Sequence, residues 1–140
     1  MSSPPVQFID ANLIMYSLGG PHPLREPCKR VLERIKAREL HVTTNTEVLQ
    51  EVLYRYFSIK RHALGEIVYR SLVQICVTVM PVRVSDTDRA LEILKSYKVI
   101  TSRDAIHAAT MINNGIEEII STDPHFDSIP EIRRTDPASL

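Results

Sequence analysis

Four carboxylates lie far apart along this chain, at positions from which one folded domain could bring them together. They are Asp10, Glu51, Asp104 and Asp123. Asp10 closes the segment of residues 6–9, and Asp123 follows the segment of residues 116–120; both segments are rich in strand-forming apolar residues, so each acid comes just after an expected strand. Open parallel sheets gather their chemistry at the carboxyl ends of the strands. Two carboxylates about 4 Å apart repel by about 4 kcal/mol at an effective dielectric of about 20, so a shared site requires a cation or a captured proton.

The elements that would position these acids alternate between strands and helices. After the strand at 6–9 and a short helix, apolar spacing predicts helices at 24–35, 48–57 and 62–78, with a strand at 41–43 between the first two. The end of the helix at 62–78 is ambiguous, because residues 75–79 are largely β-branched and could form a strand. Further strands are expected at 81–84, 116–120 and, at the edge, 132–134. Asp86 and Ser102 are expected to cap two helices, the second running to Asn114-Gly115.

This order predicts an α/β fold, a three-layer α/β/α sandwich around a central parallel sheet of four or five strands. The 140 residues are expected to form a single domain, 1–140, with 1–5 and 136–140 frayed. The formal net charge is zero, which removes the basic footprint typical of nucleic-acid binders, so a polyanion would be held by local patches or by metal. Cys28 and Cys76 fall on apolar helix faces, as buried reduced thiols do. The chain has neither a signal-peptide pattern nor an apolar run long enough to span a membrane, so we expect a cytoplasmic protein.

Four stretches resemble the PIN domain family, and within it the VapC-type toxin ribonucleases. They are Phe8-Ile9-Asp10-Ala11-Asn12, Val48-Leu49-Gln50-Glu51-Val52-Leu53, Ser102-Arg103-Asp104-Ala105-Ile106-His107-Ala108-Ala109 and Ile120-Ser121-Thr122-Asp123. The resemblance covers residues 6 to about 127. It implies a divalent-metal-dependent endoribonuclease that hydrolyses RNA phosphodiester bonds with Mg²⁺ or Mn²⁺. It also implies an antitoxin partner, and we expect a homodimer.

Carried over by position, Asp10, Glu51, Asp104 and Asp123 match the catalytic, metal-binding acids of that family. Magnesium prefers oxygen ligands, and such ions lower the pKa of a bound water and neutralise a leaving oxygen. Asp10 and Asp104 are the expected direct ligands, Glu51 a ligand or a water-orienting base, and Asp123 a ligand to a second ion or through water. Four further positions are expected in supporting or alternative roles: Asn12, Thr122, Asp127 and Glu47. Glu47 lies one helical turn before Glu51, so either could be the second acid.

Each of these residues also has an ordinary structural interpretation. Asp104 near a helix start is favoured by the helix dipole, Asp10 and Asp123 could cap or form a turn, and Glu51 could be a solvated helix charge. His107 is expected on a helix surface rather than at substrate, and His125 stays open. Four cations could contact RNA phosphates or simply face solvent: Arg55, Lys60, Arg61 and Arg103. Three functions remain as alternatives: an RNA maturation or quality-control PIN nuclease, a non-catalytic PIN scaffold and a receiver-like phosphorylation module.

Overall fold

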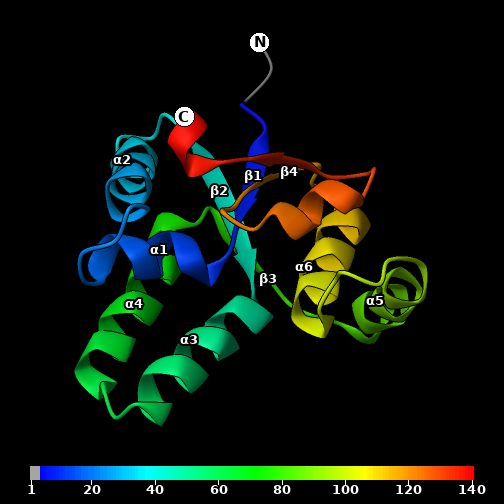
Figure 1. Cartoon of the computed structure of the whole chain (residues 1–140), viewed down its shortest axis with the longest axis horizontal. Coiled ribbons are helices and arrows are strands. Elements are labelled where there is room, and N and C mark those ends of the chain that lie inside the picture. Colours follow the sequence, from blue (N-terminus) through cyan, green and yellow to red (C-terminus); the bar gives the residue numbers. More distant parts are fainter. Residues whose placement is uncertain (1–3) are drawn as a thin grey trace.

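The computed structural model of this protein describes residues 4–140 and contains one five-stranded sheet (Figure 1). Its strands are all parallel and stand in the order β3-β2-β1-β4-β5. Their bounds are β1 Val6–Ile9, β2 His41–Asn45, β3 Thr78–Met80, β4 Glu118–Ile120 and β5 Arg133–Thr135. The expected parallel α/β sheet is therefore confirmed, with the fifth strand at one edge and β3 at the other.

Six α-helices connect the strands and cover both faces of the sheet. They are α1 Ala11–Leu18, α2 Arg25–Lys36, α3 Thr46–Ser58, α4 His62–Ile75, α5 Val84–Ser96 and α6 Ser102–Asn113. Short 3-10 helices follow at η1 Pro124–Ser128 and η2 Pro137–Ser139. Figure 1 shows α1, α2 and α4 on one side of the strands and α5 and α6 on the other. Parallel crossovers are right-handed, so the chain changes face when it returns from β3 to β4. This reversal makes the gap between β1 and β4 the topological switch point, where open α/β sheets bind ligands.

The central strands are buried on both faces, which explains their apolar sequences. Phe8 and Ile9 of β1 and Ile119 and Ile120 of β4 are fully buried. Two buried threonines of β2 satisfy their hydroxyls on neighbouring strands: Thr43 Oγ1 donates to the Thr78 carbonyl at 3.0 Å and Thr44 Oγ1 donates to the Ile9 carbonyl at 2.9 Å. The second bond ties the end of β2 to the last residue of β1, beside Asp10.

The third strand lies earlier in the chain than expected. The predicted strand at 81–84 is wrong: β3 is Thr78–Met80, and Val84 already belongs to α5. Pro81 has no N–H for a ladder, which ends the strand. Asp86 is the third residue of α5 rather than its cap, and its Oδ2 accepts from the Arg83 backbone N–H at 2.8 Å. The cap of α6 is Thr101, one residue before the expected Ser102, and its hydroxyl accepts from the Asp104 N–H at 3.2 Å.

The carboxyl-terminal segment, where we expect fraying over 136–140, forms the short helix η2. Asp136 accepts from the Ala138 N–H at 2.9 Å and so caps η2, and Pro137 is buried with η2 packed against α2. At the other end, Pro4 and Pro5 are exposed, and residues 1–3 lie outside the described part of the chain. Cys28 is buried, Cys76 is half-buried, and both are free thiols. No helix within residues 4–140 has the length and apolar character needed to cross a membrane.

Candidate active site

Asp10 lies at the end of β1, with its side chain buried at the switch point. It is 6% exposed. Ser121, at the end of β4, donates its hydroxyl to Asp10 Oδ2 at 2.7 Å, while Oδ1 is buried without a hydrogen-bond partner among residues 4–140. Burial raises the pKa of Asp10, and the charge of Glu51 raises it further, whereas the Ser121 hydrogen bond and His107 lower it. A buried carboxylate oxygen without a donor is unusual in a folded protein and marks a place for a ligand.

Asp104 and Asp123 form an acidic pair on the β4 side of the switch point. Asp104 is in the first turn of α6, and Asp123 follows β4 and caps η1 through the His125 N–H at 2.9 Å. Burial and repulsion by Asp123 raise the pKa of Asp104 from 3.8 to about 6. One ligand atom from each of Asp104, Asp123 and His125 lies within 4.8 Å of the others. His125, left open from the sequence, therefore belongs to this group.

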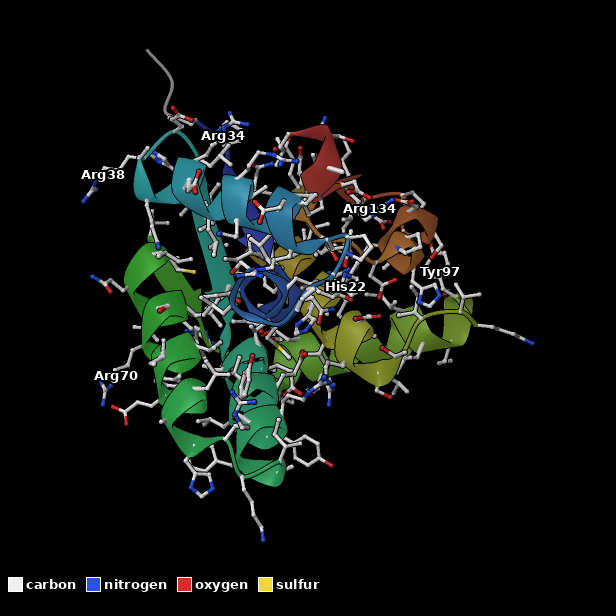
Figure 2. The ribbon with its side chains drawn as sticks, turned by 60° about the vertical axis from the view of Figure 1, so that its left-hand side comes forward. His22, Arg34, Arg38, Arg70, Tyr97 and Arg134 are labelled. Carbon is white, nitrogen blue, oxygen red and sulfur yellow. The ribbon has the colours of Figure 1, made fainter. Side chains whose placement is uncertain are left out.

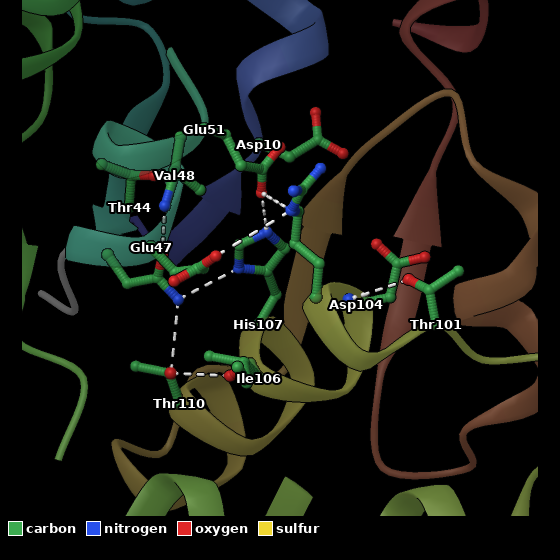
Figure 3. Close-up of polar contacts among 12 residues, drawn as sticks. Asp10, Thr44, Glu47, Val48, Glu51, Thr101, Asp104, Ile106, His107 and Thr110 are labelled. Atoms are coloured by element: carbon green, nitrogen blue, oxygen red, sulfur yellow. Dashed lines mark hydrogen bonds and ion pairs between the residues drawn. The ribbon is translucent and has the colours of Figure 1, made fainter. Parts of the chain in front are cut away.

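The Glu51 side chain contacts a residue of α6 and is not simply a solvated charge on the surface of α3. Its Oε1 is 2.7 Å from Nε2 of His107, which is 1% exposed (Figure 3). The expectation of a surface histidine is therefore wrong, because the imidazole packs on Phe8 of β1 with ring centroids 5.4 Å apart. His107 lowers the pKa of both Asp10 and Asp104, so it lies close enough to each of these acids to influence its charge.

Glu47 lies at the rim of the site and is linked to it through Arg103. The Arg103 Nε is 3.9 Å from Glu47 Oε1 and 3.6 Å from Glu51 Oε1 (Figure 3). The Glu47 side chain is 27% exposed, against 17% for Glu51. Because Glu51 also interacts with His107 and Asp10, the geometry favours Glu51 as the second acid of the cluster.

Ser121 is the hydroxyl residue that organises the strand end, although the sequence pointed to its neighbour Thr122. Ser121 Oγ donates to Asp10 and accepts from the Asp123 backbone N–H at 3.1 Å, so it links two acids of the quartet. Thr122 is half-buried, and Asn12 is exposed in the first turn of α1. The feature of the sequence that could have identified Ser121 is its position directly after β4. Side chains alternate in direction along a strand, and the first residue past the strand can point toward the end of β1.

Asp127, expected in a supporting or alternative role, is engaged elsewhere. It forms a bidentate pair with Arg134, with Nε–Oδ1 at 2.9 Å and Nη2–Oδ2 at 3.1 Å. Arg134 also donates to the Ser121 carbonyl at 2.9 Å and lies 3.5 Å from Asp136. Figure 2 shows Arg134 between the η1 segment and the carboxyl-terminal turn. Asp127 thus holds the loop after β4 in place, on the side of β5.

A hollow of about 310 Å³ lies beside Asn12, between α1, α3 and α4, with Arg55 and Arg61 in its wall. A larger hollow of about 450 Å³ lies at the opposite end of the sheet, around His41 and Val77, remote from the acids. Hollow size therefore does not mark the chemistry in this molecule. The acids at the switch point do, since they combine burial, mutual repulsion and an unpaired carboxylate oxygen.

Comparison with known proteins agrees with this geometry. The family model of the PIN domain matches residues 8–132. Ribonuclease VapC13 of Mycobacterium tuberculosis is 33% identical over 126 residues, which cover 90% of this chain and 96% of that protein.

Solved structures share the fold at lower identity. The crystal structure of Mycobacterium tuberculosis VapC20, a sarcin-ricin loop cleaving toxin, superposes with a TM-score of 0.73 at 20% identity, covering 91% of this chain and 98% of that one. VapBC2 from Rickettsia felis, bound to a DNA fragment from its promoter, gives a TM-score of 0.72 at 16% identity, with 93% and 97% covered. Matched over nearly its whole length by the family model and by a relative at 33% identity, this chain belongs to the PIN domain family and, within it, to the VapC group.

Proposed function

We propose that this protein is a toxin endoribonuclease that hydrolyses RNA phosphodiester bonds with the help of Mg²⁺ or Mn²⁺. The observation that carries the proposal is the buried Asp10 carboxylate with an unpaired oxygen at the switch point, close enough to Glu51 to be repelled by it. Ser121 links Asp10 to the group formed by Asp104, Asp123 and His125. The relatives named as VapC ribonucleases support the reaction, and the toxin–antitoxin complexes among the structural neighbours support the toxin role.

The donor set fits a hard divalent cation. All four acids of the quartet offer oxygen, the ligand that Mg²⁺ and Mn²⁺ prefer. The raised pKa values of Asp10 and Asp104 show that the protein alone does not compensate the two carboxylates. We assign Asp10 and Asp104 as direct ligands, with Glu51 and Asp123 as further ligands or as acceptors for coordinated water. An ion held there would activate a water molecule for attack on phosphorus and would stabilise the charge on the leaving oxygen.

The remaining residues prepare the site and hold the substrate. Ser121 orients the Asp10 carboxylate and holds the backbone of Asp123, and so links the ends of β1 and β4. Arg103 is half-exposed and pairs with Glu47 and Glu51. Once a cation compensates the charge of the acids, the Arg103 guanidinium would be free to bind an RNA phosphate instead. Arg55 and Arg61 line the adjacent hollow and would contact phosphates further along the strand. Asn12 and Thr122 would orient water at the rim.

We further propose an antitoxin protein as the partner, a homodimer as the assembly and the cytoplasm as the location. A PIN nuclease for RNA maturation would use the same site, and genomic neighbourhood separates the two: a toxin gene adjoins that of a small DNA-binding protein. A non-catalytic scaffold would lack part of the acidic quartet, and all four acids are present here. A receiver-like module would carry a lysine after a late strand, where this chain has Ser121-Thr122-Asp123.

The test is cleavage of a structured RNA with Mn²⁺, compared with cleavage in chelator. Asp10→Asn and Asp104→Asn are expected to lose about 100-fold or more in rate, because each removes a ligand charge. Asp88→Asn, an exposed carboxylate on α5, is the matched control and should cleave like wild type. Glu51→Gln against Glu47→Gln decides which glutamate serves the site, with the larger loss expected at Glu51. Cleavage that persists in chelator, or equal rates for wild type and Asp10→Asn, would refute the proposal.

A further inference from the structure

The amide of Asn45 has only one orientation compatible with its surroundings. Asn45 ends β2 and caps α3, and its Oδ1 accepts from the Val48 backbone N–H at 2.9 Å. Because a backbone N–H can only donate, the atom facing it must be the amide oxygen. The amide nitrogen Nδ2 then points away from α3, toward α6.

Both hydrogens of that amide nitrogen are used on α6. Nδ2 lies 3.3 Å from Thr110 Oγ1 and 3.1 Å from His107 Nδ1. Thr110 donates its own hydroxyl proton to the Ile106 carbonyl at 2.7 Å, so its oxygen receives the first amide hydrogen as an acceptor. The second amide hydrogen points at His107 Nδ1. Asn45 is fully buried, so water does not compete for these bonds.

This arrangement sets the tautomer of His107. Since Asn45 donates to Nδ1, that ring nitrogen must carry a lone pair, and the ring proton is on Nε2. Nε2 faces Glu51 Oε1 at 2.7 Å, and His107 therefore donates to the carboxylate. The donors run in one direction, from Val48 through Asn45 and His107 to Glu51, as the dashed lines in Figure 3 trace.

We propose that His107 is a positioning residue that holds Glu51 through Nε2–H, and that Asn45 is the residue that fixes its tautomer. The proposal rests on the proposed function of the acidic site and adds residues that the four family acids do not include. The contacts of the Glu51 carboxylate within residues 4–140 both use Oε1, one with His107 and one with Arg103, so Oε2 is not engaged by these partners and is available to a cation. A fixed carboxylate loses less conformational freedom when it binds an ion.

The hydrogen-bonded chain from Val48 through Asn45 and His107 to Glu51 also links the two layers of helices. Asn45 and Glu51 belong to α3 and its cap, on the side of the α2–α3–α4 connections, whereas His107 and Thr110 belong to α6, which follows the change of face. Asp10 directly follows the strand β1 between them, and Phe8 of that strand packs against the imidazole. These hydrogen bonds therefore set the distance between Glu51 and Asp104, the acid of α6, across the sheet edge.

The tautomer can be read in the metal-free protein by long-range ¹H–¹⁵N NMR of the imidazole nitrogens. The His107 signals, assigned by their loss in His107→Gln, are expected to show a protonated Nε2 and an unprotonated Nδ1. In Asn45→Ser the serine still caps α3 but offers no donor within reach of His107, so the signals should shift toward a mixture of both tautomers. A wild-type signature with the proton on Nδ1 would overturn the assignment.

The positioning role is tested by Mn²⁺ affinity, measured by calorimetry, and by thermal stability measured in parallel. His107→Leu is expected to bind Mn²⁺ about 10- to 100-fold more weakly, as losses of such supporting partners do. His107→Gln, whose amide N–H can replace Nε2–H, should recover most of that affinity. Asn113→Ser is the matched control: it removes an amide donor on the same helix, bonded to Asp86 at 2.8 Å, away from the acids. It should lower stability and leave Mn²⁺ affinity unchanged.

The outcomes separate this proposal from the function on which it rests. Mn²⁺ affinity in His107→Leu equal to wild type, or no recovery in His107→Gln, would overturn the positioning role while leaving the nuclease intact. A wild-type protein that shows the Nε2–H signature but neither binds Mn²⁺ nor cleaves RNA would overturn the proposed function instead, and the positioning role with it. Weak Mn²⁺ binding in His107→Leu, recovery in His107→Gln and normal binding in Asn113→Ser would support the proposal.

Discussion

Asp104→Asn should make the metal-free protein more stable at neutral pH. The pKa of Asp104 is raised from 3.8 to about 6, because burial disfavours the charged carboxylate and Asp123 repels it. A raised folded-state pKa of an acid means that its contribution to stability is fully present below about pH 4. It is lost as the pH rises through about 6. Above that window, the ionised Asp104 is a cost that asparagine removes.

Holding Asp104 ionised in the folded protein costs on the order of 1 to 2 kcal/mol, because the carboxylate is partly exposed and solvent screens the repulsion by Asp123. Asparagine also forfeits about 0.5 kcal/mol of favourable interaction between the carboxylate and the α6 dipole. The net gain of about 1 kcal/mol should raise the midpoint of thermal unfolding by about 3–4 °C for a domain of this size.

The assay is thermal unfolding followed by circular dichroism in chelator at pH 7.5 and pH 4. The gain should appear at pH 7.5 and vanish at pH 4, where wild-type Asp104 is protonated. Asp88→Asn, the exposed control on α5, should shift neither midpoint. With excess Mn²⁺ the wild type should gain more than the variant, since binding stabilises the folded state by mass action. A lower midpoint at pH 7.5, or an equal gain at both pH values, would refute the reasoning that the acids crowd one another.

Three further substitutions test the contacts that hold the surrounding fold together. For each, the free energy of unfolding is measured by urea denaturation in chelator. Ser121→Ala leaves the buried Asp10 carboxylate without its 2.7 Å donor and should cost about 1–3 kcal/mol at pH 7.5; a neutral result would mean that water replaces the hydroxyl. Gly65→Ala places a Cβ 2.8 Å from the Tyr56 Cβ, where α4 crosses α3, and should cost about 1–3 kcal/mol, so an unchanged midpoint would contradict the close approach. Arg134→Met should cost about 1–2 kcal/mol, because it releases both carboxylate partners and a carbonyl of the β4 loop; a loss that persists at pH 2, where those carboxylates are protonated, would point to packing instead.

The positions of the four acids followed from the sequence because strand ends and helix turns are local signals. Asp10 and Asp123 come just after short segments rich in β-branched and aromatic residues, and a parallel sheet brings the ends of such strands to one edge whatever the details of packing. The supporting residues had no local signal of this kind. His107 looks like any polar residue one turn after Asp104, and its burial depends on Phe8 from β1 and Asn45 from β2. Such contacts between distant segments are set by tertiary packing alone.

The misplaced third strand has a physical cause of the same type. Residues 75–84 are rich in β-branched side chains on both sides of Pro81, so propensity alone does not choose between two short strands. The choice is made by hydrogen bonds that the sequence does not display. The Val77 N–H donates to the Val42 carbonyl at 2.8 Å and starts the pairing with β2, while Asp86 draws the Arg83 N–H into the start of α5.

The two outer strands carry a consequence for how copies of this protein behave at high concentration. β3 and β5 are each three residues long, and the sheet is open beyond them. Pro81 stops the one strand directly, and Arg133 of the other holds its guanidinium 2.8 Å from Glu118 on the neighbouring strand. An invading strand would find few free backbone groups on either side and would have to pass charged side chains at one of them. The molecule can therefore keep a parallel sheet with a strongly buried centre without offering a template for fibril growth.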